Sequence, residues 1–113
     1  MSVDSLGVPS VKAREVKERL DGGDPIFLLD VREADEVATA SIVGAHVIPL
    51  GEVMRRAGEI PKDRDVVVFC HMGGRSAMAV WQLKRKGWTR VANMEGGIEA
   101  WSLEVDPSVA RYE

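Results

Sequence analysis

Cysteine is almost absent from this sequence, and the single residue of that type, Cys70, limits the chemistry that the chain can carry. A lone cysteine cannot form a disulfide within its own chain, so any redox step at Cys70 must involve a second molecule. The sequence also lacks a CxxC pair and nearby His and Cys partners, which leaves a structural zinc site without a ligand set. We therefore expect neither a metal ion nor an organic cofactor.

Long apolar runs and an excess of basic residues are missing as well. No apolar run approaches the ~18 residues that a membrane span requires, and residues 1–10 have neither the basic nor the apolar part of a secretory leader. The 15 basic residues are scattered among 18 acidic ones, for a net charge of -3, and form no basic stripe for nucleic acid. These absences predict a cytoplasmic protein that binds neither membranes nor nucleic acid.

The size and composition are those of one ordinary globular domain. The chain has 113 residues, of which 45% are hydrophobic and 29% are charged. This length allows one hydrophobic core but hardly two. We predict a single domain over residues 1–113, with loosely ordered ends at 1–9 and 107–113.

Short apolar runs alternate with segments that favour helices. The expected strands are 26–29, 45–48, 66–69 and 90–93, and the expected helices are 11–20, 33–40, 50–57, 76–86 and 98–103. Because parallel strands need crossover connections, this order predicts an α/β fold with a mostly parallel central sheet and helices on both faces. Ligands of such sheets bind outside the carboxyl ends of the strands, and Cys70 directly follows the strand 66–69.

The segment from Cys70 to Ser76 (CHMGGRS) carries the strongest chemical signal. A thiol at the start of a helix faces unpaired N–H groups and the positive end of the helix dipole, and Arg75 adds a full charge, so the thiolate is favoured. Gly73 and Gly74 let backbone N–H groups converge on one anion. We assign Cys70 and Arg75 as catalytic residues, and the anion-binding loop as His71, Met72, Gly73, Gly74 and Ser76.

Four segments in the right order resemble the rhodanese family of sulfurtransferases. They are Leu28–Arg32, Ile42–Ala45 with Ile48-Pro49, Cys70–Ser76, and Asn93–Gly97 with Trp101. The resemblance implies a rhodanese-like three-layer domain of the thiosulfate sulfurtransferase type. It further implies that Cys70 takes a sulfane sulfur from thiosulfate or a related small anionic persulfide donor, and passes it from a Cys70 persulfide to a thiophilic acceptor.

The end of the chain adds a second, weaker resemblance. Residues 101–108 (WSLEVDPS) are similar to the end of rhodanese domains fused behind E1-like adenylyltransferases, which serve ubiquitin-like sulfur carriers. This similarity implies that the acceptor is a thiol or a sulfur-carrier protein.

Two other functions compete with sulfur transfer. Cysteine-dependent phosphatases and arsenate reductases also use a cysteine loop that ends in arginine, but their loops have five residues between Cys and Arg, whereas four separate Cys70 from Arg75. A tighter ring of N–H donors suits a single sulfur better than a tetrahedral phosphate. The other alternative is a non-catalytic module that binds a sulfur-carrier protein, although such a module would typically have lost its cysteine.

Three further residues have uncertain places in this scheme by sequence alone. Asp30 follows a buried strand and is expected to orient the loop or to cap the next helix. Arg32 is expected either to bind an anionic substrate or to be a solvated or ion-paired residue of the surface. His71 is expected to influence the choice of substrate more than the rate.

Overall fold

The computed structural model describes residues 2–3 and 7–113, and its order of elements follows the sequence closely. The strands are β1 (Ser2–Val3), β2 (Pro9–Val11), β3 (Phe27–Asp30), β4 (His46–Val47), β5 (Val66–Phe69) and β6 (Val91–Met94). The helices are α1 (Ala13–Asp21), α2 (Ala34–Thr39), α3 (Gly74–Arg85) and α4 (Gly97–Glu104), with the 3-10 helices η1 (Leu50–Glu52) and η2 (Ala57–Glu59).

The strands form one sheet in the order β1-β2-β6-β5-β3-β4. The β1–β2 pair is antiparallel and the other neighbouring pairs are parallel. All residues of β5 are buried, as expected for a central strand whose two faces are both covered. The predicted mostly parallel sheet is confirmed, and β5 brings Cys70 to its carboxyl edge.

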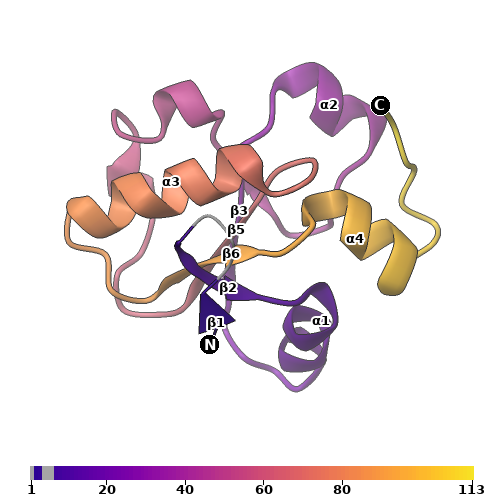
Figure 1. The fold of residues 1–113 in the computed structure, drawn as a ribbon, viewed down its shortest axis with the longest axis horizontal. Coiled ribbons are helices and arrows are strands. Elements are labelled where there is room, and N and C mark those ends of the chain that lie inside the picture. The colour runs from indigo at the N-terminus through magenta and orange to yellow at the C-terminus, as the bar shows by residue number, and fades with distance from the viewer. Residues whose placement is uncertain (1, 4–6) are drawn as a thin grey trace.

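Helices cover both faces of the sheet, which makes three layers (Figure 1). One hydrophobic cluster packs α3, η2 and their neighbours against alternate residues such as Val66 and Val68. The other cluster packs α1 and α4 against the intervening residues, such as Val67 and Phe69. Because successive side chains of a strand point to opposite faces, the apolar run of β5 supplies both clusters.

Two predicted elements differ from the structure. Residues 50–57 were expected to form a helix, but they contain only η1 and a series of turns before η2. Gly51 lowers the helix propensity of this segment. Val11 was expected in the first helix and instead ends β2, where it pairs with Met94.

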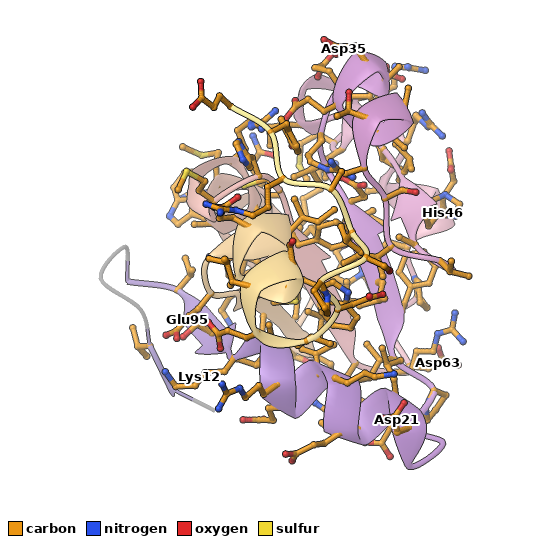
Figure 2. All side chains as sticks on the ribbon, turned by 90° about the vertical axis from the view of Figure 1, so that its right-hand side faces the viewer. Lys12, Asp21, Asp35, His46, Asp63 and Glu95 are labelled. Carbon is orange, nitrogen blue, oxygen red and sulfur yellow. The ribbon has the colours of Figure 1, made fainter. Side chains whose placement is uncertain are left out.

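The start of α1 is tied to the neighbouring strand by polar contacts. Lys12 Nζ lies 3.4 Å from Glu95 Oε2, and the two side chains lie close together in Figure 2. Ser10 Oγ donates to Glu95 Oε1 at 3.0 Å. These contacts hold β2 beside β6, although the sequence predicted no strand at residues 9–11.

None of the helices in the described part of the chain has both the length and the apolar character needed to cross a bilayer.

Candidate active site

Cys70 lies in the turn between β5 and α3, with its side chain at the carboxyl edge of the sheet. The residue is 2% exposed, and its sulfur has two polar neighbours. The backbone N–H of Gly73 donates to Sγ at 3.1 Å, and Ser76 Oγ lies 3.3 Å from the same atom. The sulfur therefore borders the apolar core on one side and hydrogen-bonding groups on the other.

The turn takes this shape because of Gly73, which precedes the first residue of α3. Gly73 has a φ of +116°, a conformation that side chains disfavour. The backbone there folds back so that the Gly73 N–H points at the sulfur. The first N–H groups of any α-helix have no acceptor within the helix, and in α3 these belong to Gly74, Arg75 and Ser76. The loop therefore directs the N–H of Gly73 at the sulfur and leaves the N–H groups of Gly74, Arg75 and Ser76 without an acceptor inside the helix.

Ser76 connects the sulfur to a residue on the neighbouring strand. Its Oγ lies 2.5 Å from Asn93 Oδ1, and Asn93 Nδ2 donates to the carbonyl of Gly73 at 3.1 Å. Because a carbonyl oxygen only accepts, the Ser76 hydroxyl hydrogen points to Asn93 in this arrangement. A thiol at Cys70 can then donate to Ser76 Oγ, whereas a thiolate would attract the hydroxyl hydrogen toward itself.

Arg75 makes no hydrogen bond to the sulfur and instead forms a bidentate salt bridge with Glu36 of α2. Its two terminal nitrogens lie 2.6 and 2.8 Å from the two carboxylate oxygens. The hydrogen bonds from Arg75 lower the pKa of Glu36 to about 2, from its usual 4.5. Arg75 thus fastens the end of the loop to α2 while it keeps a positive charge near the site.

Arg32 is ion-paired, as one expectation held, but it lies in the interior with 0% exposure rather than on the surface. Its side chain is held by Asp30, with Nε at 3.0 Å from Oδ1 and Nη2 at 2.7 Å from Oδ2. The remaining N–H groups reach the carbonyls of Glu36 and Ala40 and the hydroxyl of Tyr112. All five guanidinium donors are used within the domain, which leaves none for a substrate.

Asp30 therefore binds Arg32 rather than the loop. The N-cap of α2 is Glu33, which forms a capping box with Glu36, so Asp30 does not cap this helix. Since Arg32 binds two carbonyls of α2 and the turn after it, the buried pair positions the helix whose Glu36 holds Arg75. Asp30 and Arg32 therefore support the site indirectly, by holding α2 in place.

The other two loop side chains lie on its outer side. His71 stacks on Tyr112 with ring centroids 4.0 Å apart, and its Nε2 lies 3.8 Å from Glu99 Oε1. Met72 is 65% exposed. Neither side chain forms a hydrogen bond with the sulfur of Cys70, whose partners are Gly73 and Ser76.

The turn between β6 and α4 supports the loop through backbone hydrogen bonds. The backbone N–H groups of Ile98 and Glu99 donate to the carbonyls of Cys70 and His71 at 2.9 and 3.1 Å. Gly97 makes this approach possible, because a Cβ there would lie 2.4 Å from the carbonyl oxygen of Cys70. These bonds fix the backbone of the two residues at the start of the loop.

Four residues that hold the loop have no site role predicted from the sequence: Glu36, Asn93, Gly97 and Tyr112. Asn93 carried a usable signal, since it is a polar residue in a buried run that ends beside β5. Glu36 and Tyr112 carried none, because each has its effect through contacts with distant residues. Among the described residues, no group of three or more His, Cys, Asp or Glu side chains is arranged to hold a metal ion.

Comparison with known proteins places this site in a family. The family model described as "Rhodanese-like domain" matches residues 12–104. The chain belongs to the rhodanese-like domain family. Its relatives include proteins named as sulfurtransferases, and the family resemblance read from the sequence is confirmed.

Individual rhodanese-like relatives agree. The chain is 38% identical over 103 residues to the sulfurtransferase of Allochromatium vinosum, covering 91% of this chain and 96% of that protein. It is 37% identical over 112 residues to the adenylyltransferase and sulfurtransferase MOCS3-1 of Zea mays, covering 90% of this chain and 23% of that protein. A crystal structure of thiosulfate sulfurtransferase from Pseudomonas aeruginosa superposes with a TM-score of 0.82 at 30% identity, covering 94% of this chain and 21% of that one.

Rhodanese-like relatives are often much longer than this chain. The chain spans between 23% and 55% of the length of several curated proteins that it matches. The similarity to the adenylyltransferase fusions, expected from residues 101–108, is confirmed by the maize relative.

Proposed function

We propose that the chain is a sulfurtransferase that carries a sulfane sulfur on Cys70 as a persulfide. The observation that carries this proposal is the 3.1 Å hydrogen bond from the Gly73 N–H to Cys70 Sγ at the start of α3. A donor at this position stabilises negative charge on sulfur, and the thiolate is the reactive form of cysteine. The family membership and the relative from Allochromatium vinosum support the same activity.

The proposed reaction has two displacements at sulfur. The Cys70 thiolate attacks the outer sulfur of thiosulfate, a new S–S bond forms, and the old S–S bond breaks with its electron pair leaving on sulfite. The terminal sulfur of Cys70–S–S⁻ is then attacked by cyanide or a thiolate, and Cys70 leaves as a thiolate. No net oxidation or reduction of the protein occurs over the cycle.

The loop would stabilise the charge that moves through these steps. The N–H groups at the start of α3 would serve as donors to a sulfur that extends beyond Sγ, because they have no acceptor within the helix. Ser76 would turn its hydroxyl from Asn93 toward the anion, because both acceptors lie within its reach at 2.5 and 3.3 Å. Arg75 and Glu36 would keep the end of the loop in place.

We propose thiosulfate as a donor and a thiol or a sulfur-carrier protein as the acceptor. The structural neighbour from Pseudomonas aeruginosa is named a thiosulfate sulfurtransferase, which supports the donor. The maize relative joins adenylyltransferase and sulfurtransferase in its name, which supports a carrier-linked role. A pull-down with a ubiquitin-like sulfur carrier tests the acceptor, and failure to retain the carrier in either the free or the persulfide form would contradict it.

Intact-mass measurement after incubation with thiosulfate tests the central proposal. The parent should gain one sulfur atom, and added cyanide should remove it with formation of thiocyanate. Cys70→Ser is the control and should gain nothing. A parent protein without the added sulfur, particularly one that hydrolyses phosphate esters, would contradict sulfur transfer and favour the phosphatase alternative.

A further inference from the structure

The last residues of the chain lie against the candidate site. After α4, the chain crosses to α2 and ends beside it (Figure 1), and Figure 2 shows this segment passing over the side of the molecule that carries α4. Ser102 Oγ donates to the carbonyl of Val109 at 2.6 Å, and Arg111 Nε donates to Glu99 Oε2 at 2.9 Å. The sequence predicted a loosely attached end at 107–113. In the structure, Val109 and Arg111 of this end form hydrogen bonds with residues of α4.

The hydroxyl of Tyr112 connects two ion pairs, Asp30–Arg32 and Glu36–Arg75. It donates to Glu36 Oε2 at 2.8 Å and accepts from Arg32 Nη1 at 3.2 Å. Burial raises the pKa of Tyr112 above its usual 10.0, so the hydroxyl keeps its proton at neutral pH and remains a donor. The buried Arg32 and the loop residue Arg75 are therefore linked through Tyr112 and Glu36.

The ring of Tyr112 contacts the beginning of the loop, at His71. It stacks on His71 at a centroid distance of 4.0 Å and an interplanar angle of 15°. His71 is the residue after Cys70, and Arg75 is the residue before Ser76. One side chain thus braces the loop on both sides of Gly73, whose N–H faces the sulfur.

We infer that Tyr112 is a positioning residue that holds the cysteine loop in its anion-binding shape through His71 and Glu36. The inference rests on the proposed function in that the shape matters for sulfur transfer. Tyr112 contacts Arg32, Glu36 and His71 rather than the sulfur of Cys70, so its effect must pass through the loop. Since the ring makes one aromatic stack and the hydroxyl makes two hydrogen bonds, the ring and the hydroxyl contribute separately.

Hydrogen exchange of the loop amides tests whether Tyr112 holds the loop. In full-length Tyr112→Ala, the amides of residues 71–75 should exchange about fivefold faster than in the parent, as expected from the loss of one aromatic stack. Tyr112→Phe keeps the ring and should show a smaller increase. Leu20→Ala is the control, because it removes apolar packing from α1 and should not accelerate the loop selectively.

Turnover of thiosulfate tests whether this positioning matters for the reaction. We expect kcat/KM to fall by about fivefold in Tyr112→Ala and to recover in large part in Tyr112→Phe. The loss from Tyr112→Phe should also be non-additive with that from Glu36→Gln, because both act on the same carboxylate.

Two results would overturn the inference. One is loop exchange in Tyr112→Ala equal to that of the parent, a result that needs no sulfur donor. The other is faster loop exchange in Tyr112→Ala with kcat/KM unchanged from the parent. A parent that takes up no sulfur would instead overturn the proposed function, and the exchange measurement would still decide whether Tyr112 holds the loop.

Discussion

Two neighbouring turns of this protein have the same backbone arrangement, but their N–H groups bind different partners. The β5–α3 turn and the β6–α4 turn both leave a buried parallel strand, pass through a glycine with positive φ, and begin a helix. The glycines that precede the helices are Gly73, with a φ of +116°, and Gly96, with a φ of +73°. At the same edge of the sheet, each helix therefore has N–H groups that find no acceptor within the helix itself.

The difference lies in what those N–H groups bind. In the second turn, the N–H groups of Ile98 and Glu99 bind the carbonyls of Cys70 and His71. In the first turn, the N–H of Gly73 binds the sulfur of Cys70. A helix N-terminus is therefore a candidate anion site only where its N–H groups are not already bound to backbone carbonyls. In this protein that condition favours the turn that contains Cys70. The second turn is a support for the first.

Gly97→Ala should break this comparison with the largest effect. Its Cβ would meet the carbonyl oxygens of Cys70 and His71 at 2.4 and 2.5 Å, and its φ of +57° disfavours a side chain. Sulfur uptake, followed by intact mass, should slow by about a hundredfold because the loop backbone must move.

A matched control separates this overlap from backbone strain. Gly23→Ala places a Cβ at a φ of +90° with no atom within 4 Å. It should lower the free energy of unfolding by about 1–2 kcal/mol and leave sulfur uptake at the parental rate. Equal rates in the two variants would show that the support from the second turn is unimportant.

Gly73→Ala should alter the first turn alone. The nearest atom to its Cβ, the backbone nitrogen of Gly96, lies at 3.6 Å, so the substitution is strained by its φ rather than by overlap. We expect sulfur uptake to slow by about tenfold, because the N–H that faces the sulfur shifts. Sulfur uptake slowed more by Gly73→Ala than by Gly97→Ala would reverse the order proposed here.

Ser76→Ala should sharpen the comparison by removing the side-chain donor and keeping the backbone. Sulfur uptake should slow by about fivefold, the size of one modest hydrogen bond. Ser76→Thr retains the hydroxyl and should be less affected, as measured by the same mass assay. Equal losses in both variants would assign the effect to packing around the buried residue.

Acid should loosen the first turn through its ion pair, with the smallest effect. The Glu36 pKa is lowered to about 2 from 4.5, mainly by hydrogen bonds from Arg75. The pair therefore adds stability above pH 4.5, and this contribution is lost as the pH falls through about 2. In urea unfolding, Glu36→Gln should be less stable than the parent at pH 6, and the difference should shrink toward pH 2. A constant difference would show that Glu36 acts through packing.

The predicted strands and the structure agree best where the signal is local. Residues 66–69 form β5 as predicted, because four consecutive apolar residues fit a strand buried on both faces. Residues 50–57 show the limit of the same approach. Their composition favours a helix, but Gly51 and the short connection to β5 leave only 3-10 turns.

The site was predictable to the extent that one segment contains it. The loop from Cys70 to Ser76 was found from its cysteine, glycines and arginine, and the structure brings Gly73 and Ser76 to the sulfur. The burial of Arg32 was not predicted, because it depends on Asp30, on α2 and on Tyr112, which is 80 residues away. No local pattern records such a contact.

The sequence by itself determined the α/β order, the central strand and the position of a reactive cysteine before a helix. These features follow from the alternation of apolar runs and from glycine, which act over a few residues. The tertiary structure decided which groups hold the loop of that cysteine in place: Asn93, the amides of α4, Glu36 and Tyr112. They meet only when distant segments pack together, since the directions of hydrogen bonds and the closeness of backbones are set by the folded arrangement of the whole chain.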